Sequence, residues 1–126
     1  MKIGVPKEVK THEYRIGLVP GSVRELVHHG HRVLVESGAG AGIGFDDASY
    51  RRAGAEIMAD AAEIFGAAEM IVKVKEPQPQ EILLLREDQV LFTYLHLAAD
   101  RDLTKGLLRS GAVGIAYETV TDERGG

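Results

Sequence analysis

Short, nearly continuous apolar runs alternate with segments of helical periodicity along the whole chain, and no linker, repeat or low-complexity stretch divides them. Runs such as "VLFTY" and "VGIAY" lack the alternation of a strand with one wet face. They are typical of strands covered on both faces, as in a parallel sheet. Six segments are therefore expected to be strands: residues 2–6, 31–36, 55–58, 70–75, 89–94 and 112–117.

The first helical segment, "PGSVRELVHHG" (residues 20–30), carries signals at both ends. Ser22 and Glu25 have the spacing of a capping box, and Gly30 offers the left-handed conformation that ends many helices. The apolar face of this helix is expected to consist of Val23, Leu26 and Val27.

A second long helix is predicted in "DRDLTKGLLRSG" (residues 100–111). Acidic residues occupy its first turn, Arg109 its last turn, and Gly111 follows it, as expected for a helix dipole and its end. Leucines at helical spacing should form its apolar face: Leu103, Leu107 and Leu108. Shorter helices are expected in residues 46–54, 59–66 and 77–85.

This order of elements predicts an α/β fold with a mostly parallel, doubly wound sheet, helices on both faces and right-handed crossovers. Such sheets are Rossmann-like or flavodoxin-like. Because 126 residues is about the length of one domain, we expect a single domain over residues 1–126.

The charge balance is that of an ordinary, mildly acidic protein, with 15 Lys and Arg against 19 Asp and Glu. This balance does not favour nucleic acid as a partner. No apolar stretch approaches the ~20 residues that cross a bilayer, and the start does not resemble a signal peptide, so we expect no membrane partner and a cytoplasmic protein. The absence of cysteine excludes disulfides, thiolate metal sites and a cysteine nucleophile.

Three charged or titratable side chains follow predicted strands, at the edge where parallel sheets bind ligands. Arg15 follows the first strand, Lys75 ends the fourth and His96 follows the fifth. If these strands are neighbours, their ends lie ~5 Å apart per step, so the three groups could meet at one small anion. Arginine can grip a carboxylate with two hydrogen bonds, lysine supplies a point charge, and histidine exchanges protons near neutral pH, which together suit a small oxo acid.

Each of these residues also has a plainer interpretation. Arg15 can be a solvated loop residue, and Lys75 can form a surface ion pair with Glu76 that contributes little to stability. His96 can make a purely structural hydrogen bond. Convergence at one edge of the sheet favours the three together as a substrate site.

Two other motifs are weaker. "ESGAGAGIGF" (residues 36–45) has the context of a dinucleotide fingerprint, but Ile43 stands where the third glycine belongs, and Asp46 and Asp47 would repel a phosphate, so it is interpreted as a flexible loop. "HHGH" (residues 28–31) straddles a helix end, where adjacent side chains diverge, so no metal site is expected.

Five stretches of the chain resemble, in order, the amino-terminal part of the L-alanine dehydrogenases: "MKIGVPKEVKTHEYRIGLVPGSV", "VLVESGAGAGIGFDDASYRRAGAEI", "MIVKVKEP", "LFTYLHLAAD" and "GAVGIAYETV". The NAD-binding subunit of proton-translocating transhydrogenase shares the "IGVPKE" opening and the glycine-rich loop. Its counterparts of "KVKEP" and "TYLHLA" lack the second lysine and the histidine, whereas Lys75 and His96 are present here. The resemblance therefore favours the dehydrogenases, with saccharopine dehydrogenase-like proteins a distant third.

The resemblance implies reversible oxidative deamination of L-alanine to pyruvate and ammonia, with hydride passed to NAD. It implies that Arg15 binds the substrate carboxylate, that Lys75 contacts pyruvate oxygens, and that His96 transfers a proton at the substrate carbonyl. Members of this family are homo-oligomers, with a hexamer implied here.

Family members are about three times as long and carry the NAD-binding Rossmann domain beyond the region that this chain resembles. The chain is accordingly expected to be a fragment with no NAD site of its own and no activity alone. A non-catalytic domain that binds a small carboxylate or forms an interface is the alternative of a different class.

Overall fold

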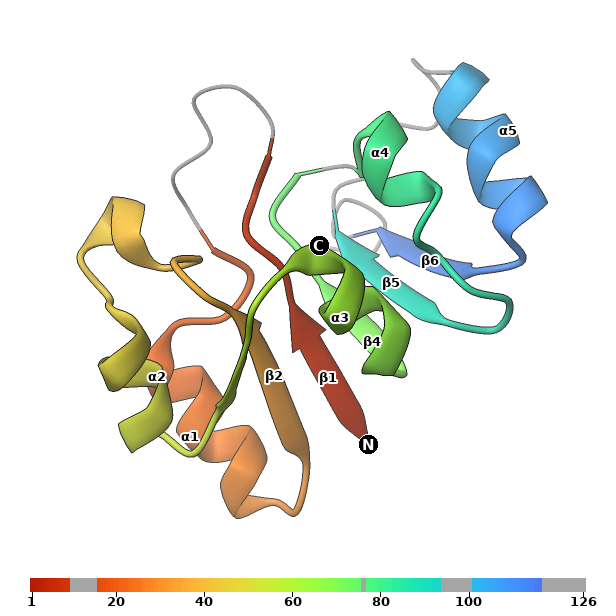
Figure 1. Cartoon of the computed structure of the whole chain (residues 1–126). Coiled ribbons are helices and arrows are strands. Elements are labelled where there is room, and N and C mark those ends of the chain that lie inside the picture. The colour runs from red at the N-terminus through yellow and green to blue at the C-terminus, as the bar shows by residue number, and fades with distance from the viewer. Residues whose placement is uncertain (10–15, 76, 94–100, 117–126) are drawn as a thin grey trace, which may run out of the picture.

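A computed structural model of the chain describes residues 1–9, 16–75, 77–93 and 101–116. Within these ranges one sheet of six parallel strands forms in the order β3-β2-β1-β4-β5-β6 (Figure 1). The prediction of a mostly parallel sheet is confirmed. The strands are β1 (Lys2–Val5), β2 (Arg32–Glu36), β3 (Glu56–Met58), β4 (Met70–Val72), β5 (Val90–Thr93) and β6 (Val113–Ala116).

A helix precedes each strand from β2 onward, as the alternation of the sequence predicted. The helices are α1 (Pro20–His28), α2 (Asp47–Arg52), α3 (Ala61–Ala67), α4 (Pro79–Ile82) and α5 (Arg101–Ser110), with a 3₁₀ turn η1 (Ala41–Ile43) before α2.

Two separate hydrophobic clusters show that both faces of the sheet are covered. Leu34 packs with α3 residues Ile64 and Phe65, whereas its neighbours Val33 and Val35 belong to the other cluster. Successive strand residues point to opposite faces, so the two clusters lie on opposite sides of β2. The second cluster takes in α1 and α2 through Val23, Tyr50 and Ala53.

The order of the strands places a topological switch point between β1 and β4. From β1 the chain moves outward through β2 to β3, and then crosses back to β4 on the other side of β1. Ligands of open parallel sheets bind outside the carboxyl ends of the strands at such a point, because the connections diverge there.

The beginning of α1 differs from the prediction. The helix starts at Pro20 with Val19 as its N-cap, and no side chain caps it. Proline is preorganised for the first helical position, so the helix begins before Ser22, and the predicted Ser22–Glu25 capping box is wrong. The predicted end is confirmed, since Gly30 adopts a φ of 90°.

The expected apolar face of α5 is wrong at Leu108, which is 77% exposed. Leu103 and Leu107 lie in the helix, but the structure does not describe their side chains. The helix ends as predicted, with Gly111 at a φ of 73°. On α4, the backbone N–H of Gln78 donates to Glu81 Oε1 at 2.9 Å, a capping contact that was not predicted.

Candidate functional site at the carboxyl edge of the sheet

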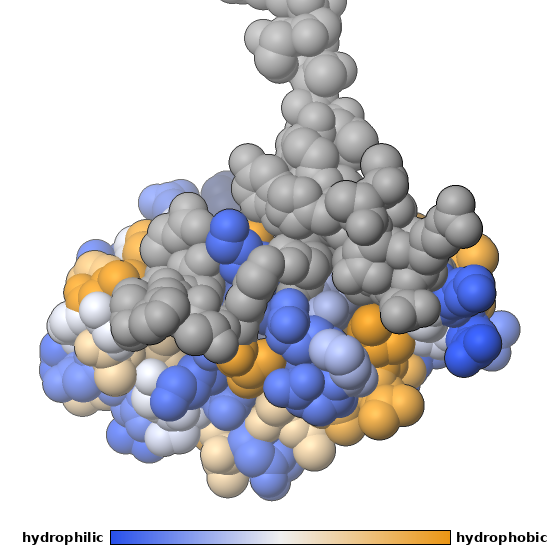
Figure 2. Space-filling view, turned by 90° about the horizontal axis from the view of Figure 1, so that it is seen from above, coloured by the Kyte–Doolittle hydropathy of each residue, from blue (hydrophilic) through white to orange (hydrophobic). Residues whose placement is uncertain are grey.

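The three strands expected to carry the site are neighbours. β4 pairs with β1 on one side and with β5 on the other, so their carboxyl ends are ~4.8 Å apart from strand to strand. β1 runs upward from the N-terminus in Figure 1, so its carboxyl end points toward the viewer of Figure 2, which looks from above. The described residues visible in that view are both hydrophilic and hydrophobic. Arg15 and His96 lie outside the described residues, whereas Lys75 is described.

Lys75 is half-buried, three residues beyond the end of β4. Its backbone N–H donates a 3.1 Å hydrogen bond to Glu8 Oε1. Its carbonyl oxygen accepts a 2.7 Å hydrogen bond from Thr93 Oγ1, at the end of β5. The peptide groups of Lys75 are thus bonded to the segments that follow β1 and end β5.

Glu8 is buried and its carboxylate accepts three hydrogen bonds. Besides the bond from Lys75, Oε1 accepts one of 3.1 Å from Lys73 Nζ, and Oε2 accepts one of 3.1 Å from the backbone N–H of Val74. A buried carboxylate is costly unless it is paired and hydrogen-bonded, and Glu8 meets both conditions.

Lys73 lies between two acids. Its Nζ is 3.1 Å from Glu8 Oε1 and 3.0 Å from Glu81 Oε2, and all three side chains are at most 3% exposed. Two carboxylates share one ammonium in this buried triad, so its formal charge is −1 when both acids are ionised. Burial raises the pKa of Glu81, and the nearby Lys73 ammonium offsets only part of that effect.

The chain returns to the same edge after residue 15. Ile16 is buried in the cluster that includes Val5, and a Cβ on Gly17 would lie 2.4 Å from the carbonyl oxygen of Val72. Only glycine allows the backbone to approach the end of β4 so closely.

The glycine-rich loop after β2 bonds to its own acids. Asp47 accepts 2.6 and 2.8 Å hydrogen bonds from Ser37 Oγ and the backbone N–H of Gly38, and these bonds lower the pKa of Asp47. Asp46 caps α2 by accepting from the backbone N–H of Ser49 at 2.8 Å. A phosphate would meet both negative charges here, which agrees with the interpretation of this segment as a loop.

In "HHGH" the rings of His28 and His29 pack edge to face with their centroids 5.6 Å apart, so the expected divergence of adjacent side chains is wrong for this pair. His29 Nε2 lies 3.9 Å from Glu25 Oε2, and His31 Nδ1 lies 3.4 Å from the N-terminal nitrogen. No group of three potential metal ligands occurs in the part of the chain that the structure describes. Within the same part, no helix is long and apolar enough to cross a membrane.

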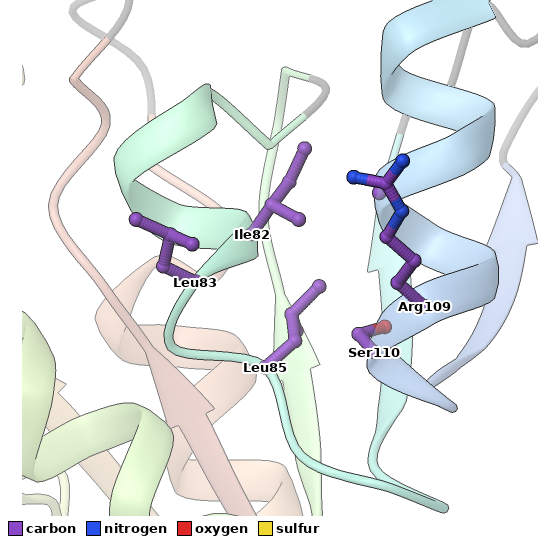
Figure 3. A pocket seen from close by; sticks show the side chains of 6 residues that line it. Ile82, Leu83, Leu85, Arg109 and Ser110 are labelled. Atoms are coloured by element: carbon purple, nitrogen blue, oxygen red, sulfur yellow. The ribbon is translucent and has the colours of Figure 1, made fainter.

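A groove of about 280 Å³ lies between α4 and α5. Ile82 and Arg109 point toward each other across it (Figure 3). Leu85, Gly106 and Ser110 complete most of its lining. Lys75 is not among the described residues that line this groove.

Sequence reasoning missed Glu8, Thr93, Lys73 and Glu81 as parts of the site. One signal was available: Lys73 lies within a predicted buried strand, and a buried ammonium needs an acidic partner. The partner itself was not predictable, because Glu8 is 65 residues away in the sequence. Glu76, the alternative partner of Lys75, lies outside the described residues.

Comparison with known proteins places the whole chain in one family. The family model described as "Alanine dehydrogenase/PNT, N-terminal domain" matches residues 4–126. Alanine dehydrogenase of Halomonas elongata is 58% identical over 126 residues, which are 100% of this chain and 34% of that protein. Alanine dehydrogenase of Bacillus subtilis is 54% identical over 124 residues, 98% of this chain and 32% of that protein.

Solved structures agree with this assignment. An L-alanine dehydrogenase superposes with a TM-score of 0.96 at 53% identity, covering 100% of this chain and 35% of the other. A transhydrogenase from Sinorhizobium meliloti gives a TM-score of 0.91 at 29% identity, covering 98% and 37%. The chain thus spans about a third of the length of these relatives. It belongs to the alanine dehydrogenase/PNT N-terminal domain family.

Proposed function

We propose that the chain forms the substrate-binding side of an NAD-dependent L-alanine dehydrogenase, which converts L-alanine reversibly to pyruvate and ammonia. The observation that carries this proposal is the identity of 58% over the whole chain to a relative named alanine dehydrogenase. The position of Lys75 beside the β1/β4 switch point supports it, because that is where a parallel sheet binds its ligand.

Three residues would handle the substrate. Arg15 would grip the carboxylate with two parallel hydrogen bonds, and Lys75 would hold a pyruvate oxygen with its ammonium. His96 would exchange a proton at the carbonyl. The segments that contain these residues follow three adjacent strands, β1, β4 and β5, which supports their convergence.

The proton steps follow from these positions. During reductive amination, ammonia adds to the pyruvate carbonyl, and the carbonyl oxygen must gain protons before it leaves as water. His96 as imidazolium donates a proton to that oxygen, and in the reverse direction the neutral ring accepts it. The chemistry that bound NAD would supply is acceptance and return of the hydride at the substrate carbon.

The NAD site, in this proposal, belongs to the part of the relatives that the chain does not cover. The active protein would be a cytoplasmic homo-oligomer, a hexamer by resemblance, and this chain alone would not turn over alanine. A transhydrogenase function is supported less, because the identity is 29% with the transhydrogenase structure and 53% with the dehydrogenase structure.

A graft tests the proposal without depending on the length of the natural protein. The chain would replace the matching 126 residues of Halomonas elongata alanine dehydrogenase. We expect the purified graft to reduce NAD in the presence of L-alanine, with unreplaced enzyme as the control. A folded, NAD-binding graft without this activity would contradict the proposal and favour a non-catalytic domain.

His96 can then be tested within the active graft. His96→Asn keeps a hydrogen-bond donor but removes proton exchange, so kcat should fall by ~10²–10⁴ and the near-neutral limb of its pH profile should disappear. The NAD affinity should change little. A less stable variant with nearly full activity and the same pH profile would show that His96 is only structural.

A further inference from the structure

We propose that Glu8 and Thr93 are positioning residues that fix the backbone of Lys75 from opposite sides, and that buried Lys73 and Glu81 hold the Glu8 carboxylate in place. This inference rests on the proposed function, because it concerns the lysine assigned to the substrate. It adds a supporting shell of four residues, Glu8, Thr93, Lys73 and Glu81, none of which needs to touch the substrate.

The need for such support follows from where β4 ends. The last ladder residue of β4 is Val72, and beyond it the N–H of Lys73 still bonds to the carbonyl oxygen of Phe92 at 3.0 Å. The next two N–H groups, of Val74 and Lys75, are bonded to the Glu8 carboxylate instead of a strand. A side chain therefore replaces the sheet at the point where the chain leaves it.

Thr93 completes the support from the other side. It is fully buried, and its hydroxyl donates the 2.7 Å hydrogen bond to the Lys75 carbonyl oxygen. A lysine side chain has several rotatable bonds, so the position of its ammonium is defined only if its backbone is fixed first. With Glu8 on the N–H and Thr93 on the carbonyl, the two peptide groups of Lys75 are both held.

The buried charges explain why Glu8 stays in place. Its carboxylate loses solvation on burial, and the Lys73 ammonium at 3.1 Å compensates for that loss. Glu81 contacts the same ammonium at 3.0 Å from α4, so Lys73 is fixed between two elements. Glu8 and Thr93 belong to the segments after β1 and at the end of β5, so the backbone of Lys75 is bonded to both neighbouring strand ends.

Variants of the graft that change single polar atoms test this inference. Thr93→Val keeps the shape but loses the hydroxyl, and we expect kcat/KM for pyruvate to fall by about ten- to a hundredfold, mainly through KM. Thr93→Ser should restore it to within about threefold, because the hydroxyl returns. Glu8→Gln should act like Thr93→Val, while the KM for NADH should stay unchanged in all three variants.

Glu36→Gln is the matched control. Glu36 accepts a 2.9 Å hydrogen bond from the backbone N–H of Lys7, next to Glu8, but it is not part of the Glu8–Lys73–Glu81 triad. It should leave the pyruvate KM unchanged. If Thr93→Val also leaves the pyruvate KM unchanged, or if Thr93→Ser is as impaired as Thr93→Val, the inference is overturned. An active graft whose pyruvate KM is insensitive to Lys75→Met would also overturn it, while leaving the proposed dehydrogenase activity intact.

Amide hydrogen exchange provides a readout that does not depend on activity. Glu8→Gln should speed exchange at Val74 and Lys75 by about tenfold or more, since their shared acceptor is weakened, whereas Glu36→Gln should not. If the graft proves inactive, the proposed function fails, and this measurement still decides whether the shell exists. Unchanged exchange in Glu8→Gln would show that it does not.

Discussion

Two loops at the carboxyl edge of the sheet provide hydrogen-bond partners for their backbone N–H groups in different ways. After β2, the glycine-rich loop bonds to Asp47, whose partners Ser37 and Gly38 are about ten residues away. After β4, the backbone of Val74 and Lys75 bonds to Glu8, which is more than 60 residues away and buried. The first loop is closed locally by a partly exposed acid, whereas the second depends on a charge network that joins the segments after β1 and β4 to α4.

The difference fits the proposal that the substrate binds beside Lys75. Burying three ionisable side chains adds less stability than an apolar core of the same size would, so such a group is expected where position matters more than stability. The site beside Lys75 has this character. The glycine-rich loop does not, because Asp46 is an exposed helix cap and the partly exposed Asp47 bonds only to Ser37 and Gly38 nearby in the sequence.

The largest effect should come from removing the shared cation of the triad. Lys73→Met leaves Glu8 and Glu81 buried without a positive partner and should lower the free energy of unfolding by about 3–5 kcal/mol. Urea denaturation of the chain measures this. Arg32→Met, which breaks the exposed Arg32–Glu56 pair, is the control and should shift the midpoint far less. Equal shifts would mean that the triad is no more important than a surface pair.

Glycine substitutions separate stability from function in the two loops. A Cβ on Gly17 would meet the Val72 carbonyl oxygen at 2.4 Å, and one on Gly40 would meet the Phe45 carbonyl oxygen at 2.6 Å. Either glycine changed to alanine should cost about 1–3 kcal/mol of stability by thermal or urea unfolding. In the graft, only Gly17→Ala should raise the pyruvate KM; an equal rise in Gly40→Ala would remove the functional distinction between the loops.

Asp47→Ala should have a smaller effect confined to stability. It removes two hydrogen bonds in a partly exposed loop, so a loss of about 1–2 kcal/mol is expected. Steady-state kinetics of the graft should show unchanged KM values for pyruvate and NADH. A raised KM for NADH would instead revive the glycine-rich loop as part of a dinucleotide site.

The smallest effect is a difference in pH dependence between the loops. The pKa of Asp47 is lowered by its hydrogen bonds, so its contribution is present above its unfolded pKa of about 4 and is lost as the pH falls through the lower folded value. The pKa of Glu81 is raised by burial, so the contribution of Glu81 to stability is greatest in acid and declines as the pH rises from about 4.3 through the raised folded value.

Unfolding curves between pH 3 and 8 test these signs. Glu81→Gln should flatten the decline above pH 4.3 and be at least as stable as the parent at pH 7, because it no longer buries a second carboxylate. Asp47→Asn should reduce the loss in acid. A Glu81→Gln protein that is markedly less stable at pH 7 would show that the ionised form of Glu81 is needed.

The sequence was informative where interactions are local. The apolar runs predicted all six strands to within a few residues, and Gly30 and Gly111 marked two helix ends. Both signals, an apolar run and a glycine that can adopt positive φ, can be recognised within a short segment. The predicted start of α1 was wrong because two local signals competed. Proline at position 20 set the start of the helix, and the Ser22–Glu25 pattern did not.

The candidate site was predictable only in part. The adjacency of β1, β4 and β5 could be anticipated from the parallel topology, and Lys75 from its place after a strand. The roles of Glu8 and Thr93 depend on contacts 67 and 18 residues apart in the chain, so no spacing rule reveals them. Arg15 and His96 remain predictions, since they lie outside the described residues.

A crystal structure of the graft soaked with pyruvate would test the central claim most directly. We predict pyruvate beside the carboxyl ends of β1 and β4, with one of its oxygens within hydrogen-bond distance of Lys75 Nζ. Pyruvate bound instead at Arg109 in the α4–α5 groove, or bound without contact to Lys75, would contradict the claim that this edge of the sheet is the substrate site.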